Sequence, residues 1–252
     1  MRSRAAAITS KTALGCAGCA LLGLALTTGT SVAASADATP ASSASQSLDQ
    51  ALGAAKAAGS ARITVQFFYG STSGKVVQDS TLHSGKQTVA IKNEIASIVL
   101  TGGTAYISGN SLGLTSYFGL PNSLVPTLTG KWVSIEPTDA AFKSVSATVA
   151  LSSALANVTP SGALAAGKRS KVDGQSVRSI SGEAPGGGGR LTLFVAADKA
   201  SLPVEAVETS GSGQAARGEI VTFSRWGEQV QVPTPTGALP LSAIEAASSA
   251  SG

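Results

Sequence analysis

Cysteine and histidine are nearly absent from this sequence, and their scarcity excludes several kinds of chemistry. The chain has two cysteines, Cys16 and Cys19, and one histidine, His83. Both cysteines lie close to the N-terminus. If that segment is removed, no cysteine remains to form a disulfide framework or a thiolate zinc site. Aromatic residues make up only 4% of the chain, so the interior must be built mainly from aliphatic side chains.

The first 36 residues have the pattern of a secretory signal peptide. Arg2, Arg4 and Lys11 form a basic region, an uncharged apolar stretch runs over residues 12–26, and small residues lead to Ala34-Ser35-Ala36. This order of basic, apolar and small residues predicts cleavage after Ala36. The apolar stretch is shorter than the ~20 strongly apolar residues of a membrane span. We therefore expect an extracytoplasmic protein, either secreted or associated with the cell envelope.

A lipoprotein signal is the alternative for this segment. Ala17-Gly18-Cys19 resembles the end of such a signal, in which the cysteine is acylated. An acylated cysteine should close the apolar run, yet residues 20–24 continue it, and Cys16 stands where leucine is expected. The sequence therefore favours cleavage after Ala36 over lipid anchoring at Cys19.

Net charge argues against nucleic acid as a partner. The signal segment holds three of the 18 basic residues and none of the 14 acidic ones, which leaves the remaining chain with a net charge of +1. Only residues 168–171, Lys-Arg-Ser-Lys, approach a basic patch. We interpret this run as a solvated turn before a strand.

Composition divides the rest of the chain into three parts. Residues 37–47 lack periodicity and predict a flexible tether, and residues 233–252, with three prolines followed mainly by Ala and Ser, predict a flexible C-terminal tail. Residues 48–232 are long enough for one domain with its own core.

The domain should begin with a helix and continue as a series of β-hairpins. Ser47 is a candidate N-cap for a helix over residues 48–58, which Gly59 ends. Alternating or turn-bounded apolar residues then predict strands at 62–69, 76–83, 88–93, 95–100, 105–108, 170–172, 176–180, 191–196, 204–209, 219–225 and 229–232. The tightest turns are predicted at Gly102-Gly103 and Asp173-Gly174.

Two segments interrupt the hairpins. Residues 111–128 are apolar and irregular, whereas residues 138–158 have helical spacing. Consecutive hairpins give antiparallel pairing, and helices gathered on one face of the sheet give an α+β fold.

No catalytic constellation emerges from the reactive residue types. Ser111 is the centre of a literal Gly-x-Ser-x-Gly motif at 109–113, but no histidine follows it that could act as its base. His83, near a turn, is interpreted as a surface residue. We therefore expect a protein that is not an enzyme.

Phosphate and metal sites are equally poorly supported. Gly186–Gly189 leads into a strand and not into a helix N-terminus, where a phosphate would bind. The acidic pairs Glu136/Asp139 and Glu205/Glu208 are interpreted as surface pairs. We therefore expect the protein to bind no cofactor and no metal ion.

The order of these elements resembles the LppX/LprG-type actinobacterial lipoproteins, which share the LolA-like fold. The motifs that carry the resemblance are GGTAYISG at 102–109, GKWV at 130–133, VDGQSV at 172–177, LTLFVA at 191–196, LPVEA at 202–206 and FSRWG at 223–227. They span most of residues 48–232. The chain departs from the family in lacking a convincing lipid-attachment cysteine.

The resemblance implies a strongly curved antiparallel half-barrel with helices on its concave face and an apolar cavity between them. It also implies a monomeric carrier or chaperone that binds a lipid or another acylated hydrophobic ligand and that contacts a membrane surface transiently. The expected cavity lining is Ile63, Val65, Phe67 and Tyr69 from the first strand, Phe142, Val145 and Val149 from the inserted helix, and Tyr117 and Phe118 at the opening.

Three alternatives stay open at this stage. The same residues could pack a solid core, because core and cavity walls look alike in sequence. The fold could also serve as a non-catalytic sensor or regulatory module that binds a protein. An exported hydrolase ranks last, because Ser111 has no downstream base.

Overall fold

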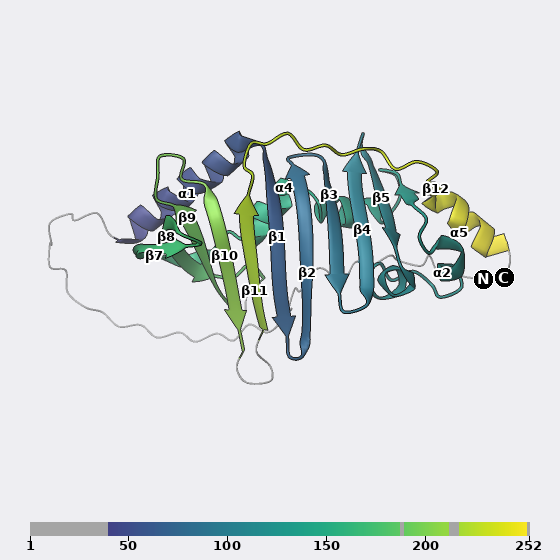
Figure 1. Cartoon of the computed structure of the whole chain (residues 1–252), viewed down its shortest axis with the longest axis horizontal. Helices are drawn as coiled ribbons and strands as arrows, with labels where there is room; N and C mark the ends of the chain where they lie inside the picture. The colour runs from purple at the N-terminus through teal and green to yellow at the C-terminus, as the bar shows by residue number, and fades with distance from the viewer. Residues whose placement is uncertain (1–39, 187–188, 212–216, 251–252) are drawn as a thin grey trace, which may run out of the picture.

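The structure of the chain is a computed structural model that describes residues 40–186, 189–211 and 217–250 (Figure 1). The predictions made for residues 1–36, namely the signal peptide and the status of Cys19, lie outside the described residues.

One twelve-stranded sheet forms the body of the protein. Its strands are β1 (Ser60–Tyr69), β2 (Thr72–Thr81), β3 (Gly85–Ile91), β4 (Glu94–Thr101), β5 (Thr104–Gly109), β6 (Val133–Ile135), β7 (Ser161–Val172), β8 (Gln175–Glu183), β9 (Arg190–Ala196), β10 (Pro203–Ser210), β11 (Arg217–Ser224) and β12 (Leu239–Pro240). All neighbouring strands are antiparallel except β12 and β6, which are parallel.

The sheet consists of two runs of hairpins that meet at β1. The strand order is β12-β6-β5-β4-β3-β2-β1-β11-β10-β9-β8-β7, so the first strand and the eleventh strand are neighbours. Their register pairs Val65 with Val221 and Ile63 with Phe223. The sheet is curved and not closed, and β12 and β7 are its edges. The α+β prediction with a curved, mainly antiparallel sheet is confirmed.

The helices lie on the buried face of the sheet and at its ends. They are α1 (Pro40–Ala58), the π-helix η1 (Gly113–Tyr117), α2 (Val125–Leu128), α3 (Phe142–Ala147), α4 (Leu151–Asn157) and α5 (Leu241–Ala250). In Figure 1 the strands lie in front, and α1 and α4 lie behind them. Among the described residues, no helix is both long enough and apolar enough to span a membrane.

The first helix is longer than the sequence predicted. It starts at Pro40, and proline suits a first helical position because its missing N–H would be unpaired there. Ser47, the expected N-cap, lies inside the helix, where its Oγ donates to the carbonyl of Ser43 at 2.8 Å. The helix ends as predicted at Gly59, which adopts a φ of +75° and donates its N–H to Ala55.

The single helix predicted for residues 138–158 is wrong, because the segment forms two short helices. Ala150 has an extended backbone, with ψ at 133°. The carbonyls of Thr148 and Val149, which a continuous helix would use internally, accept hydrogen bonds from the sheet: Gln87 Nε2 lies 3.2 Å from Thr148 O, and Ser80 Oγ lies 2.7 Å from Val149 O. The sheet therefore breaks the helix between α3 and α4.

The C-terminal region also differs from the prediction. Residues 229–232 form no strand, and the flexible tail expected over 233–252 is wrong for residues 239–250, which form β12 and α5. Residues 225–238, the C-terminal strap, run along one end of the sheet (Figure 1). Their backbone carbonyls accept hydrogen bonds from Ser60 Oγ and Thr101 Oγ1. Leu241 is then buried at 4% exposure, and this packing orders an Ala-rich helix that is weak by itself.

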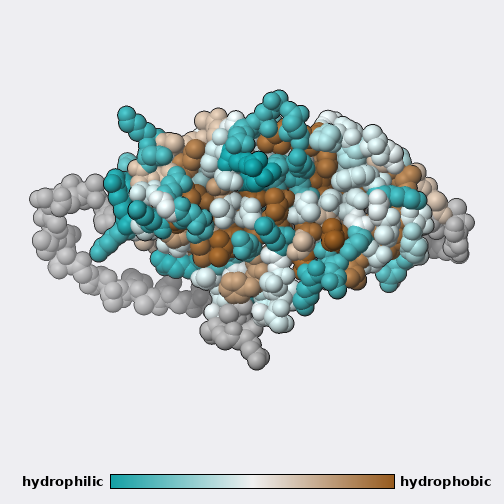
Figure 2. All heavy atoms as spheres, viewed as in Figure 1, coloured by the Kyte–Doolittle hydropathy of each residue, from teal (hydrophilic) through white to brown (hydrophobic). Residues whose placement is uncertain are grey.

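Two apolar clusters fill the concave side. The first, under β2–β6, contains the irregular segment with Phe118 and Leu120, the α3 residue Val145, and Leu241. The second lies under α1 and α4 against β1 and β8–β11. Val65 contacts both clusters, so β1 is where they join. The opposite, convex face is a mixture of polar and apolar side chains (Figure 2).

Candidate ligand-binding site

The four residues predicted to line a cavity from the first strand have different surroundings. Ile63 is 1% exposed and belongs to the cluster under α1. Val65 is half-buried against both clusters, and Phe67 is half-buried against the cluster under β2–β6. Tyr69 is 53% exposed, and the Arg217 guanidinium lies over its ring at 4.7 Å from the centroid. Tyr69 therefore lies at the end of the sheet, outside the apolar interior.

Tyr117 and Phe118 were expected at an opening, but they are buried in the cluster under β2–β6. Phe118 has no exposed surface, and Tyr117 is 6% exposed. Their rings meet edge to face, with centroids 5.2 Å apart. Because η1 turns these side chains inward, they help to fill the concave side and do not border an entrance.

Phe142, Val145 and Val149 pack in the same cluster as Tyr117 and Phe118. Val145 and Val149 have no exposed surface, and Phe142 is half-buried. The structure thus brings seven of the nine predicted residues into one cluster: Val65, Phe67, Tyr117, Phe118, Phe142, Val145 and Val149. They pack against one another there.

A cleft lies elsewhere, between α1, α4 and the start of β7. It is open to solvent, has a volume of about 370 Å³ and is lined by Leu52, Lys56, Ser152, Leu155, Ala156, Thr159, Ser161 and Pro185. None of the nine predicted residues lines it. Its volume is at the lower end of the ~300–1,000 Å³ of ligand pockets.

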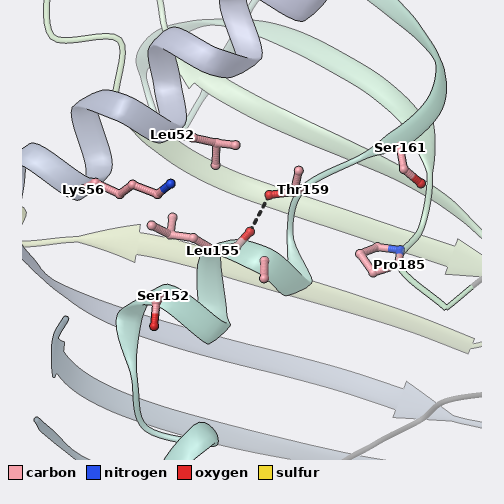
Figure 3. Close-up of a pocket in the computed structure, with 8 residues that line it drawn as sticks. Leu52, Lys56, Ser152, Leu155, Thr159, Ser161 and Pro185 are labelled. Atoms are coloured by element: carbon pink, nitrogen blue, oxygen red, sulfur yellow. Dashed lines mark hydrogen bonds between the residues drawn. The ribbon is translucent and has the colours of Figure 1, made fainter. Parts of the chain in front are cut away.

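Helical spacing places the cleft residues on facing surfaces. Leu52 and Lys56 are one turn apart on α1, and Ser152, Leu155 and Ala156 share one side of α4. Figure 3 shows Leu52 and Lys56 extending from α1 toward Leu155 and Thr159. The same spacing in the sequence could have suggested these residues, but which two helices face each other is set by the sheet on which both pack.

The chemistry of the cleft is amphiphilic. Leu155 is 2% exposed and continues into the cluster under α1, so the floor of the cleft is apolar. Lys56 is the only charged residue in the lining, and three hydroxyl residues, Ser152, Thr159 and Ser161, complete it. The Thr159 hydroxyl already donates to Leu155 O at 2.7 Å (Figure 3). Such a lining suits a molecule with an apolar chain and an anionic or polar end.

A smaller hollow of about 240 Å³ lies on the convex face, beside Trp132, Val77, Asp79 and Lys86. Its charged groups are already paired. Arg62 binds Asp79 with two hydrogen bonds of 2.6 and 2.8 Å, and this pairing holds the pKa of Asp79 below its usual value. The hollow is therefore less suited to a ligand than the cleft.

The motif around Ser111 does not form a nucleophilic site. Ser111 Oγ lies 3.2 Å from the hydroxyl of Thr129. His83 is exposed in the turn between β2 and β3, at the opposite end of the sheet from Ser111 (Figure 1). Within the described residues, no group of three histidine, cysteine, aspartate or glutamate side chains could hold a metal ion.

One carboxylate pair was assigned incorrectly from the sequence. Glu208 was paired with Glu205 as a surface pair, but the register of β10 and β11 places Glu208 directly opposite Glu219. Both face the concave side, because Glu219 also pairs with Phe67 and Glu208 with Leu191. Burial raises the pKa of Glu219, and the neighbouring Glu208 raises it further; burial also raises the pKa of Glu208.

The sequence matches no protein-family model, and it matches none of the curated proteins with which it was compared. The solved structures that are similar include two mycobacterial lipoproteins, LprF and LppX. LprF from Mycobacterium bovis is 20% identical, with a TM-score of 0.51, covering 79% of this chain and 99% of that one. The lipoprotein LppX from Mycobacterium tuberculosis is 20% identical, with a TM-score of 0.49, covering 76% of this chain and 99% of that one.

These similarities concern the fold. At 20% identity to LprF the matched residues do not transfer a ligand or a partner, but the match covers nearly all of that protein's length. The order of strands and the helices on one face of an open, curved sheet agree with the fold that the motifs at 102–109 and 191–196 indicated. The chain therefore shares its fold with LprF, as the resemblance to the LppX/LprG-type lipoproteins predicted.

Proposed function

We propose that this protein binds a single-chain hydrophobic ligand with an anionic or polar end, and that it acts as a carrier outside the cytoplasmic membrane. The observation that carries this proposal is the cleft between α1 and α4, whose apolar floor ends at one lysine. An apolar chain would lie against Leu52, Leu155 and Ala156, and the polar end would meet Lys56.

The position of the cleft suits a chain-binding site. Leu155 belongs to the cluster under α1, so a ligand in the cleft would extend an existing apolar interior. Burying an apolar chain yields ~25 cal/mol per Å² removed from water. A larger lipid would require α1 to move away from β7, against which it packs. The exported location rests on the signal-like pattern of residues 1–36.

The proposal includes no catalytic step. The cleft holds a lysine and three hydroxyl residues, but no histidine or carboxylate that could act as their base. The ligand would therefore leave the protein chemically unchanged.

Filling the cleft tests the proposal. Ala156→Trp places an indole in the cleft from an exposed position of α4, and we expect at least a tenfold loss of affinity for a fluorescent fatty acid with little change in melting temperature. Ala147→Trp is the matched control, because Ala147 is exposed on α3 and does not line the cleft.

Equal affinities of the two variants would contradict the site. Mass spectrometry of an organic extract from the purified parent protein supplies the second readout. A parent protein that retains no lipid and binds no fluorescent fatty acid would contradict the carrier function itself.

A further inference from the structure

We propose that one end of the sheet is a docking surface for an anionic membrane. This end, the lower rim, is formed by the β1–β2 turn, the β3–β4 turn and the junction between β5 and η1, all at the lower edge in Figure 1. The inference does not depend on the ligand proposed above, because a protein can dock on a bilayer with or without cargo.

The exposed large apolar side chains gather at this rim. Five such residues are exposed among the described residues, and four of them lie here: Phe68 (46%), Tyr69 (53%), Ile95 (51%) and Leu112 (48%). The fifth, Ile220 (37%), lies on the convex face of β11 opposite Gln66, in the same row of residues as Lys75. Single exposed apolar residues are ordinary, but their concentration at one end indicates an interaction surface.

Two of these residues form an aromatic tip. Phe68 and Tyr69 are the last residues of β1, directly before the turn at Gly70 and Ser71. The Phe68 ring lies over the backbone of Gly218, where a Cβ would come within 2.2 Å of it. This packing fixes the ring while leaving nearly half of the residue exposed. Tyr69 combines an apolar ring with a polar hydroxyl, a combination enriched at membrane–water interfaces.

The other two residues form an aliphatic tip. Ile95 follows the β3–β4 turn, and Leu112 opens the segment that becomes η1. Asn110 joins them, because its Oδ1 accepts the N–H of Ile95 at 3.2 Å and that of Gly113 at 2.8 Å. A side chain at 113 would collide with the carbonyl of Ile95, so this junction requires glycine. The structure thus holds Leu112 beside Ile95 on the rim.

Basic side chains stand beside both tips. Lys75, Lys92 and Lys131 are exposed, and Arg217 opens β11 opposite Tyr69. Lys131 is placed at this end because the neighbouring Gly130 donates its N–H to the carbonyl of Gly109, the last residue of β5, at 3.0 Å. Glu94 lies at the β3–β4 turn, and Glu208 and Glu219 lie on the same concave face as Tyr69 and Arg217, so the excess positive charge comes from the exposed Lys75, Lys92 and Lys131. The rim therefore presents excess positive charge.

Separated apolar tips with cations between them fit a lipid surface better than a protein surface. A stable protein interface requires a continuous, complementary patch of about 800 Å² per partner. A bilayer accepts isolated apolar side chains among its head groups, and anionic lipids attract the flanking lysines. We therefore assign the rim to an anionic bilayer surface.

Vesicle co-sedimentation tests the assignment. We expect the purified protein to sediment with phosphatidylglycerol-containing vesicles and not with phosphatidylcholine vesicles, and high salt to release it. Lys75→Gln and Lys92→Gln should each weaken binding about fivefold, and Leu112→Ser should weaken it by a similar factor. Phe68→Ser should weaken vesicle binding more than these substitutions do. The comparison requires that its melting temperature match that of the parent protein.

Matched controls lie elsewhere on the sheet. Lys168→Gln and Lys199→Gln remove exposed lysines from the edge strand β7 and from the β9–β10 turn, respectively. Both should bind vesicles like the parent protein. Unchanged affinity of the rim variants, or equal losses in the controls, would overturn the proposal.

Two further outcomes are informative. If Leu112→Ser abolishes self-association in sedimentation velocity while the parent ignores vesicles, the rim is a protein interface and the proposal is wrong. Rim variants should also keep the parent's affinity for the fluorescent fatty acid, measured without vesicles. A variant that no longer binds vesicles but still binds the fatty acid would show that membrane docking and ligand binding are separate properties.

Discussion

Glu208 and Glu219 face each other across β10 and β11 on the concave side of the sheet. Their neighbours in the same row are Phe67 and Leu191, so the pair adjoins apolar side chains. Like charges directly opposite each other destabilise a sheet. Burial is the first cause of the raised pKa of Glu219, and repulsion from Glu208 is the second.

This pair makes stability depend on pH. A carboxyl group whose pKa is raised by folding contributes most to the stability of the folded protein below its unfolded pKa, which is the ordinary value of 4.5. This contribution is lost as the pH rises through the pKa of the folded state. We expect Glu219→Gln to be more stable than the parent at pH 7 and to lose this advantage below pH 4.5. Urea unfolding at both pH values measures the difference.

The exposed residue Glu183 on β8 provides the control for charge removal. Glu183→Gln should change stability little at either pH. If Glu219→Gln destabilises the protein at pH 7, the pair is held by interactions that its burial does not account for, and the prediction is wrong.

At the scale of elements, the junction of α3 and α4 shows how the sheet shapes a helical segment. Ser80 is fully buried, accepts a hydrogen bond from Gln78 and donates to the carbonyl of Val149. At Gly85 a Cβ would lie 2.8 Å from the same carbonyl, so the close approach of this junction requires glycine.

Removing the Ser80 hydroxyl should therefore weaken the junction. Ser80→Ala leaves Val149 O and Gln78 Nε2 without this partner in a buried site, and we expect a loss of ~1–3 kcal/mol in the free energy of unfolding. Hydrogen exchange should increase first in α3 and α4. Ser73→Ala, at an exposed position of the same strand, should be nearly neutral, and an equal loss there would contradict the argument.

At the scale of the whole molecule, the C-terminal strap joins distant parts of the sheet. It leaves β11 in the centre, follows the strand ends, and places β12 beside β6 at one edge. Leu239 donates its N–H to the carbonyl of Trp132 at 2.9 Å, and Leu241 enters the cluster under β2–β6. The two-residue β12 thus covers β6 and leaves only a very short edge strand, which offers little template to another chain.

Weakening this closure should destabilise the protein as a whole. Leu241→Ala removes a side chain that is 4% exposed, and we expect a cost of ~2–5 kcal/mol in thermal or urea unfolding. Ser242→Ala, at the next and exposed position, is the control. A change below about 0.5 kcal/mol in Leu241→Ala would show that α5 contributes no stability.

The sequence alone determined the local parts of this protein. Gly102-Gly103 and Asp173-Gly174 set tight turns, because residues with positive φ match the twist of the strands that they join. Alternation placed Ile63 and Val65 on one face of β1, and Gly59 ended the first helix. These features depend on neighbours within a few positions, so the pattern of residues is sufficient to predict them.

Only the tertiary structure decided what depends on distant partners. The pairing of β1 with β11, the contact of Glu208 with Glu219, the break at Val149 and the ordering of α5 each require segments far apart in sequence to meet. The cleft was missed for the same reason, because Lys56 and Leu155 face each other only after the sheet positions α1 and α4. Long-range contacts produce no local periodicity, and the sequence of one segment does not show which distant segment it packs against.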